Sequence, residues 1–401
     1  MNRKQLTFML IGLLVLGGLG LLVHRNQQGD WQSNSKAESQ TVLGNFPLND
    51  VAQIVIKQTS GELNLAKKDE LWCVRERMDY PADFSAISDL IQKAWEMKAV
   101  QTLQVEPSEL PRLELVEPGK GASTGTRVEF KDKGGKLIQS VLLGKKHQKE
   151  SGNSPFGGGG GWSDGRYLLV SGDAHNVRLV SEPFNNAEPK PDVWLNKDFF
   201  KIDSIRSVSV TSTNATNTWK LSRETLEGEW KLADLKPGEQ TDGPRASGLA
   251  GLLANPSFID VVPPGKTNEA AKDKPVEAVL QTLDGFTYAL KFGKQGGEEK
   301  YLLTISVSAE LPKVRPPGKD EKPEDKARLD KEFLAKQEKL NEKLKKEKAF
   351  ENWSYLVASF TLDTLLKPRS DFLAEKKEEP KKENPPGTKD ALPPGLKLPG
   401  N

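Results

Sequence analysis

One serine of the chain lies in a sequence pattern that some hydrolases use. The segment Gly161–Gly165 reads GWSDG and fits the pattern G-x-S-x-G around Ser163. In a nucleophile elbow this pattern joins a strand to a helix, so that the serine hydroxyl is exposed beside a histidine base. Here a glycine run precedes the pattern and a strand-like segment, Arg166–Val170, follows it. A serine hydrolase is therefore only a remote alternative, and we assign no catalytic residue.

Metal and cofactor chemistry have little support in the sequence. Cys73 is the single cysteine, and two of the three histidines, His147 and His175, lie near predicted loop ends. No spacing of carboxylates completes a two-histidine metal site. The glycine run Gly157–Gly161 has Trp162 where G-x-G-x-x-G requires its last glycine. We expect no enzyme activity, no metal-binding residues and no cofactor-binding residues.

Aromatic residues give a second, non-enzymatic alternative. Trp72 and Trp230 occupy equivalent places in two similar stretches, and Trp162 adjoins the glycine run. Exposed tryptophans along a groove would suit a cell-envelope polymer or another ligand, bound between two modules or at the glycine loop. Burial in the core, between a sheet and its helix, is the favoured interpretation of Trp72 and Trp230.

The bulk composition restricts the class of protein. The 401 residues are enough for two domains with linkers. Lys and Arg number 58 and Asp and Glu 56, a net charge of +2. Nucleic-acid binding needs an excess of basic residues on one face, so we expect no nucleic-acid partner.

The only long apolar run is Leu6–Val23, which follows Arg3 and Lys4. Its 18 residues would span roughly 27 Å as a helix, about the thickness of a bilayer core. A cleavable signal has a shorter core and a small-x-small site after it, so an uncleaved anchor is favoured. We expect residues 1–25 to form a single transmembrane helix of the cell inner membrane, with the N-terminus cytoplasmic and the body periplasmic. A polar linker, 26–42, follows.

Residues 43–198 are predicted to form one α+β module. Short segments of alternating or apolar character predict strands near 51–57, 62–67, 71–74, 127–130, 137–144, 167–171 and 177–180. Asp83 is a candidate helix cap. Apolar residues at helical spacing follow it and predict one buried stripe: Phe84, Ile87, Leu90, Ile91, Ala94 and Trp95.

The residues 199–372 repeat this order, which predicts a second copy of the module. Eight segments correspond. They are Phe46–Val51 with Phe200–Ile205, Ile54–Ile56 with Val208–Val210, Leu63–Leu65 with Trp219–Leu221, Leu71–Val74 with Glu229–Leu232, the helix after Asp83 with a helix after Asp242 that carries Ala246, Leu249, Leu252 and Leu253, Leu143–Lys145 with Phe292–Lys294, Tyr167–Leu169 with Tyr301–Leu303, and Arg178–Val180 with Tyr355–Val357. The expected fold class is α+β, two tandem repeats of an antiparallel sheet packed with a helix.

The second module carries a charged insertion, 312–350. From Glu324 onward it is helix-forming, with Glu332/Lys336 and Glu342/Lys346 at i,i+4 spacing. Its thin apolar stripe consists of Leu329, Phe333, Leu340 and Leu344. The insertion is either a solvated helical tip or a docking helix that pairs with another helix as in a coiled coil. The Lys-, Glu- and Pro-rich tail 373–401 is expected to be disordered.

These features together resemble the bacterial domain-of-unknown-function family 4340. The residues that carry the resemblance are the N-terminal membrane segment, Ile54–Ile56, Trp72, Tyr80–Ala82, Leu143–Lys145 and Tyr167–Leu169. The resemblance implies a membrane-anchored protein exposed outside the cytoplasm, and some relatives are similar to auxiliary components of ABC-type export or gliding-motility systems. It carries over no catalytic residue. The Gly157–Gly161 loop and the 312–350 insertion depart from the family's usual pattern.

The expected function is therefore an extracytoplasmic interaction or scaffold protein. Leu6–Val23 would hold it in the membrane, where its partner would be a membrane protein complex, an ABC-type transporter in particular. The ligand-binding module and the remote hydrolase based on Ser163 are the alternatives.

Overall fold

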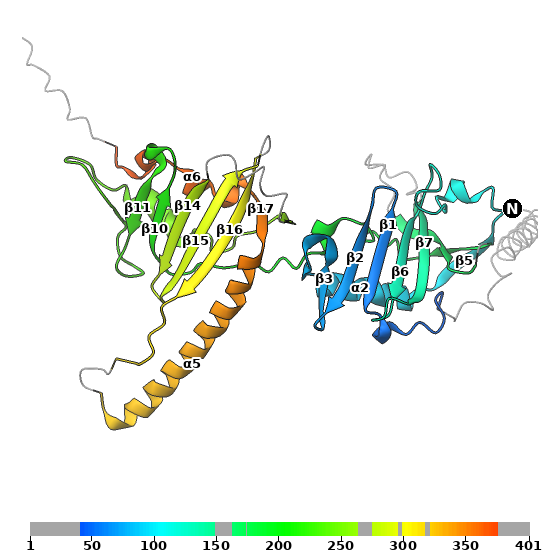
Figure 1. The fold of residues 1–401 in the computed structure, drawn as a ribbon, viewed down its shortest axis with the longest axis horizontal. Coiled ribbons are helices and arrows are strands. Elements are labelled where there is room, and N and C mark those ends of the chain that lie inside the picture. Colours follow the sequence, from blue (N-terminus) through cyan, green and yellow to red (C-terminus); the bar gives the residue numbers. More distant parts are fainter. Residues whose placement is uncertain are drawn as a thin grey trace, which may run out of the picture.

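The computed structural model describes residues 41–148, 163–173, 175–263, 275–295, 299–316 and 321–375. They form two antiparallel sheets with few helices (Figure 1). The N-terminal module consists of β1 (Gln53–Gln58), β2 (Gly61–Lys68), β3 (Leu71–Val74), β4 (Tyr80–Pro81), α2 (Phe84–Glu96), β5 (Ala99–Gln104), β6 (Thr126–Lys131), β7 (Leu137–Gln148), β8 (Ser163–Val170) and β9 (Asn176–Val180). The predicted α+β class is confirmed at this level.

The C-terminal module begins after the first sheet ends. It consists of β10 (Ile205–Thr211), β11 (Trp219–Ser222), β12 (Lys231–Leu232), α3 (Gly243–Ser247), β13 (Asp260–Val262), β14 (Val276–Thr282), β15 (Phe286–Lys294), β16 (Lys300–Ala309), α5 (Pro323–Lys348), β17 (Ser354–Ala358) and α6 (Asp363–Leu366). Apart from the short β4, the two sheets have the same strand order. The first reads β3-β2-β1-β6-β7-β8-β9-β5 and the second β12-β11-β10-β14-β15-β16-β17-β13.

The strand register places the corresponding sequence segments at corresponding positions. Leu65 lies opposite Val74 in the first sheet, as Leu221 lies opposite Leu232 in the second. These are the positions that the sequence comparison paired. Both sheets bury apolar side chains at these points, so the same inward alternation builds both cores.

One of the eight predicted correspondences is displaced by a residue. Leu143 lies opposite Leu168 on β8, whereas its counterpart Phe292 lies opposite Leu303 on β16. Leu168 and not Leu169 is therefore the structural equivalent of Leu303, and both are fully buried. The register between β7 and β8 shifts between Leu143 and Lys146. A comparison of the two sequence segments alone does not detect such a shift.

Helix α2 begins at the predicted cap. The Asp83 carboxylate accepts hydrogen bonds from the backbone N–H groups of Ser85 and Ala86. The middle of the predicted stripe is buried, but Phe84 and Trp95 are 66% and 42% exposed. The prediction was wrong for these two because they lie well to one side of the stripe's centre at about 100° per residue.

The helix after Asp242 is shorter than predicted. Asp242 caps it through the N–H of Arg245, but α3 ends at Ser247 and a 3₁₀ turn, Gly248–Gly251, follows. Each glycine lowers helix stability by roughly 1 kcal/mol relative to alanine. Leu253 then adopts a left-handed conformation, with φ of 58°, so no continuous helix reaches it.

A set of direct contacts joins the two modules. The Arg77 guanidinium donates through Nε and Nη2 to the two carboxylate oxygens of Asp260, both at 2.7 Å. The Tyr80 ring contacts Phe258 and Trp353 edge to face, with ring centroids 5.8 and 4.9 Å apart. Bidentate pairs and aromatic edges are directional, so these contacts fix the spacing of the two sheets.

Several predictions fall on segments outside the described residues. They are the anchor Leu6–Val23, the glycine run Gly157–Gly161, Trp162 and the tail beyond Glu375. Within the described ranges, the structure contains no helix that is long and apolar enough to cross a membrane. The predicted helix in the 312–350 insertion is present as α5.

Candidate functional site

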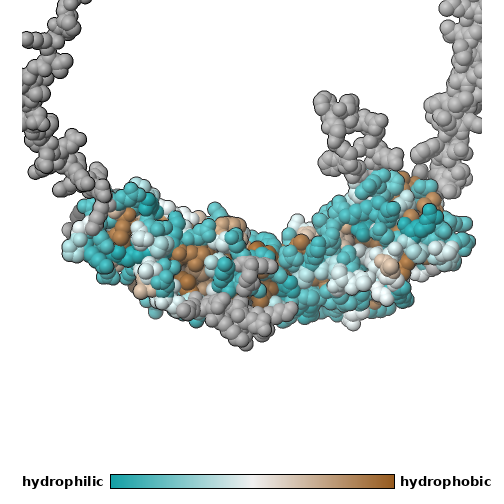
Figure 2. Space-filling model, turned by 90° about the horizontal axis from the view of Figure 1, so that it is seen from above, coloured by the Kyte–Doolittle hydropathy of each residue, from teal (hydrophilic) through white to brown (hydrophobic). Residues whose placement is uncertain are grey.

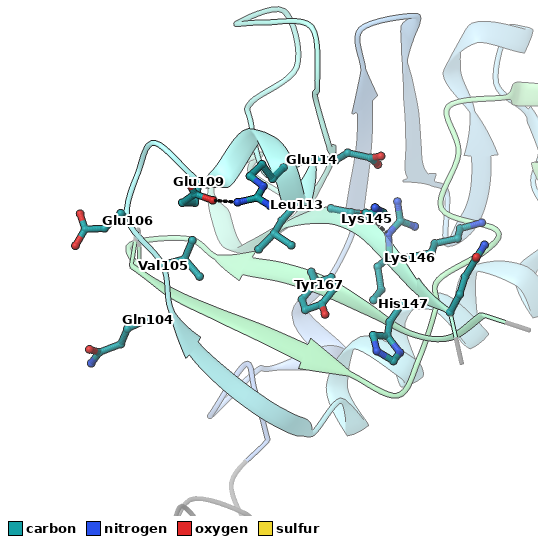
Figure 3. A pocket seen from close by; sticks show the side chains of 14 residues that line it. Gln104, Val105, Glu106, Glu109, Leu113, Glu114, Lys145, Lys146, His147 and Tyr167 are labelled. Carbon is teal, nitrogen blue, oxygen red and sulfur yellow. Dashed lines mark hydrogen bonds and ion pairs between the residues drawn. The ribbon is translucent and has the colours of Figure 1, made fainter. Parts of the chain in front are cut away.

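An open groove of about 1170 Å³ lies on the N-terminal module (Figure 3). One wall is the segment that follows β5, and the other is formed by the ends of β7 and β8. The lining residues are mostly polar or charged: Gln104, Val105, Glu106, Glu109, Arg112, Leu113, Glu114, Gly144, Lys145, Lys146, His147, Gln148, Arg166 and Tyr167.

The wall after β5 is held by a small second core. Leu115, Leu142, Leu169 and Val177 form an apolar cluster separate from the main core. The backbone contact at Gly144 is close, since a Cβ there would lie 2.3 Å from the carbonyl oxygen of Leu113. Only glycine permits such an approach, so Gly144 positions this wall of the groove.

Arg166 is the buried charge of the groove, with 9% of its surface exposed. Its Nε donates to the carbonyl oxygen of Gly144 at 2.8 Å, and its Nη1 donates to those of Pro183 and Phe184. Burial lowers the pKa of the guanidinium because the cation has lost water. Three carbonyl oxygens orient the group but do not neutralise it.

Most charges of the groove are separated by sign, although Glu114 lies on the same side as Lys145 (Figure 3). Figure 3 shows Glu106 and Glu109 on one side and Lys145 and Lys146 on the other. Glu109 is paired with Arg112 at 2.7 Å. Both lysines are exposed. The side near β7 and β8 is therefore the basic end of the groove.

The hydrolase alternative gains no support from the described geometry. Ser163 is the first residue of strand β8 and lies opposite Gln148, so no helix follows it. The His147 Nδ1 lies 2.6 Å from a carboxylate oxygen of Asp164, and its ring contacts Tyr167. A serine within a strand lacks the strand-to-helix turn that exposes a nucleophile.

The two histidines of the N-terminal module do not meet. His147 lies opposite Gly165 near the start of β8, whereas His175 precedes β9 at the other end of that strand. Eight residues of strand separate the two ends by roughly 25 Å. Among the described residues, no group of three or more His, Cys, Asp or Glu side chains is arranged to hold a metal ion.

Trp72 and Trp230 are buried core residues, only 5% and 6% exposed. A cation stacks on each ring: the Lys67 ammonium lies 5.4 Å from Trp72, and the Arg223 guanidinium lies 4.8 Å from Trp230. Lys67 on β2 and Arg223 immediately after β11 occupy equivalent places, two residues after Leu65 and Leu221. These tryptophans cannot form an exposed ligand platform, and Trp162 lies outside the described residues.

Neither the groove nor its arginine was predicted from the sequence. The segment after β5 has neither helical nor strand periodicity, so nothing indicated that it covers a sheet face. One signal was present: Arg166 lies inside an otherwise apolar strand, GRYLLV. Arginine is rarely buried unless it is paired, so a charge in such a strand can mark a site.

The fold thus defines a protein of two similar antiparallel sheets, with a charged groove on the first. Residues 72–278 match the family described as a domain of unknown function, DUF4340, and the chain belongs to this family. The matched range runs from β3 to β14, so it includes the groove and crosses the junction of the modules. No curated protein and no solved structure matches the chain.

Proposed function

We propose that this chain is a membrane-anchored interaction protein that holds a rigid two-module body outside the cytoplasm, as a scaffold beside an ABC-type membrane transport complex. The apolar run Leu6–Val23 would be its single-pass anchor in the inner membrane, and 26–42 its tether. The proposal includes no chemical step. What supports it most is a single observation: helix α5 projects from the C-terminal module (Figure 1).

The C-terminal end of α5 packs on the core of its own module, and nearer the other end Asp330 accepts a hydrogen bond from Arg315 at 2.8 Å. The helix has 26 residues and is therefore about 39 Å long. Leu340 and Leu344 pack on the main core, and Glu347 is buried at the C-terminal end. Towards the other end, Leu334 is 66% exposed. Helices gain most of their stability from packing, so the projecting half is suited to a partner.

The junction supports the same function. Arg77 and Asp260 hold the modules at a fixed spacing, so a partner bound at α5 has a defined position relative to the groove. Figure 2 shows a mostly hydrophilic surface, with hydrophobic residues gathered over the C-terminal module and near the junction. Apolar areas with polar rims are typical of contact surfaces.

Purification of the full chain from membranes tests this proposal. We expect it to recover a complex that contains a membrane-embedded transport protein. Leu329→Gln with Phe333→Gln should release that partner, whereas the control pair Lys331→Gln with Lys336→Gln on the same helix should not. A monomer without partners, recovered under gentle extraction and after crosslinking, would contradict the proposal.

The groove favours a second candidate function, a module that binds a cell-envelope polymer or ligand. The groove is large enough for such a ligand, and its lining is polar. Retention of the chain on isolated envelope polymer, and loss of retention when Tyr167 is replaced by alanine, would favour this function over the scaffold.

A further inference from the structure

We propose that the basic end of the groove is a binding site for a small oxyanion, a phosphate or carboxylate group, held by Arg166 between Lys145 and Lys146. This site goes beyond the scaffold function and does not depend on it.

The first argument is the uncompensated charge of Arg166. A buried cation is stable only when it is paired and hydrogen-bonded. No ion pair in the described part of the chain includes Arg166, whose three bonds all go to neutral carbonyl oxygens. Two carboxylates influence it without a hydrogen bond or ion pair to it: Glu114, which lines the same groove, and Glu188, which is itself paired with Lys190 at 2.6 Å. An incoming anion would supply the missing countercharge.

The second argument is the fixed orientation of the guanidinium. Carbonyl oxygens from β7 and from the chain after β9 occupy Nε and Nη1. The remaining nitrogen, Nη2, has no hydrogen-bond partner within the described ranges, and Arg166 lines the groove. A planar donor held in place loses little entropy on binding, which favours recognition of an oxyanion.

The third argument is the surroundings of Arg166. Lys145 and Lys146 are exposed, and neither forms an ion pair with the residues that the structure describes. Glu106 and Glu109 lie at the opposite side (Figure 3) and would repel an anionic chain that filled the whole groove. The ligand is therefore a compact anionic group and not a long polyanion.

The C-terminal module lacks this combination. The position of Arg166 is occupied there by Tyr301, since Arg166 lies opposite Val180 and Tyr301 lies opposite Val357. By the same register Lys146, which lies opposite Arg166, corresponds to Lys294, which lies opposite Tyr301. Lys294 therefore provides a matched control on the same fold.

Calorimetric titration of the full chain in nonionic detergent tests the site. Inorganic phosphate represents a free anion, and glycerol 3-phosphate represents a phospholipid headgroup, so the two arms distinguish these sources. Sodium chloride at equal ionic strength controls for screening. We expect saturable binding of at least one probe, weakened about tenfold or more by Lys145→Gln with Lys146→Gln and unchanged by Lys294→Gln.

Three results would overturn the proposal: heats equal to those of sodium chloride for both probes, unchanged affinity in the double variant, or equal weakening by Lys294→Gln. Arg166→Lys keeps the charge but loses the planar donor, and we expect it to weaken binding further. Its folding is checked by circular dichroism. Lys145 and Lys146 are exposed, so their replacement should leave the fold intact. The lysine variant therefore tests the site even if Arg166→Lys does not fold.

Discussion

The two modules share one strand order but differ in what has been added to it. In the N-terminal module, the segment after β5 packs on the outer side of the sheet and forms a groove around Arg166. In the C-terminal module, a 26-residue helix enters between β16 and β17 and projects away from the sheet. The common sheet is thus a framework, and each copy carries its own candidate surface.

The largest effect is expected at the equivalent tryptophans. Trp72→Ala and Trp230→Ala each remove a buried ring, which destabilises a protein by about 3–5 kcal/mol. Trp230→Ala should fall at the upper end, because it also removes the stacking of the ring on the buried guanidinium of Arg223. Chemical denaturation measures both changes. Leu71→Ala is the control, because Leu71 is 65% exposed. A loss of stability as large as that of the tryptophan variants would contradict the distinction between core and surface positions.

Next in size is the glycine that positions the groove wall. Gly144→Ala places a methyl group against the backbone of Leu113, which should destabilise the N-terminal module by about 1–3 kcal/mol. Gly251→Ala in the C-terminal module has open space around its new Cβ and should be neutral or slightly stabilising. Denaturation curves that show equal losses for the two variants would contradict the close packing of the groove wall.

The junction offers a test that involves one residue from each module. Arg77→Ala and Asp260→Ala should each destabilise by about 1–2 kcal/mol, because each leaves a largely buried charge without its partner. The double variant should lose little more than either single one. Additive losses in this cycle would show that the pair does not couple the modules.

A pH test contrasts two carboxylates of the C-terminal module. Burial raises the pKa of Glu347 above 4.5, the ordinary pKa of a glutamate. Its contribution to stability is therefore complete below about pH 4.5 and declines as the pH rises through the raised pKa. Glu347→Gln should therefore gain stability relative to the unmodified chain as the pH rises above that value. The Arg369 hydrogen bond lowers the pKa of Glu239 to about 2, so this group stabilises above pH 4.5 and ceases to do so as the pH falls towards 2. Denaturation at several pH values should give Glu347→Gln and Glu239→Gln opposite slopes of relative stability against pH, and equal slopes would contradict the account.

The smallest effect on stability is expected on the projecting half of α5. Leu334→Ala removes a side chain that is 66% exposed, so the free energy of unfolding should change by less than about 0.5 kcal/mol. Partner capture from membranes should nevertheless fall. If Leu334→Ala still captures the partner fully, this part of the helix does not belong to the contact surface.

Local patterns in the sequence predicted the framework. The short apolar or alternating segments and the capping residue Asp83 are local signals, and they indicate most strands of both sheets and helix α2. They did not predict β5, β13 or β14. The groove is not local: it depends on the contact of Gly144 with Leu113, more than thirty positions away in the chain. The junction pairs Arg77 with Asp260, which are 183 positions apart in the chain, and no periodicity in the sequence predicts such a contact.

The central claim is that α5 contacts a membrane complex while the body stays outside the cytoplasm. A photo-crosslinking residue at Leu334, expressed in intact cells, tests it most directly, with a second probe at the exposed Lys220 of β11 as the control. We predict a crosslink from position 334 to a membrane-embedded transport protein and none from position 220. Crosslinks from both positions to the same abundant proteins, or from neither, would contradict the scaffold function.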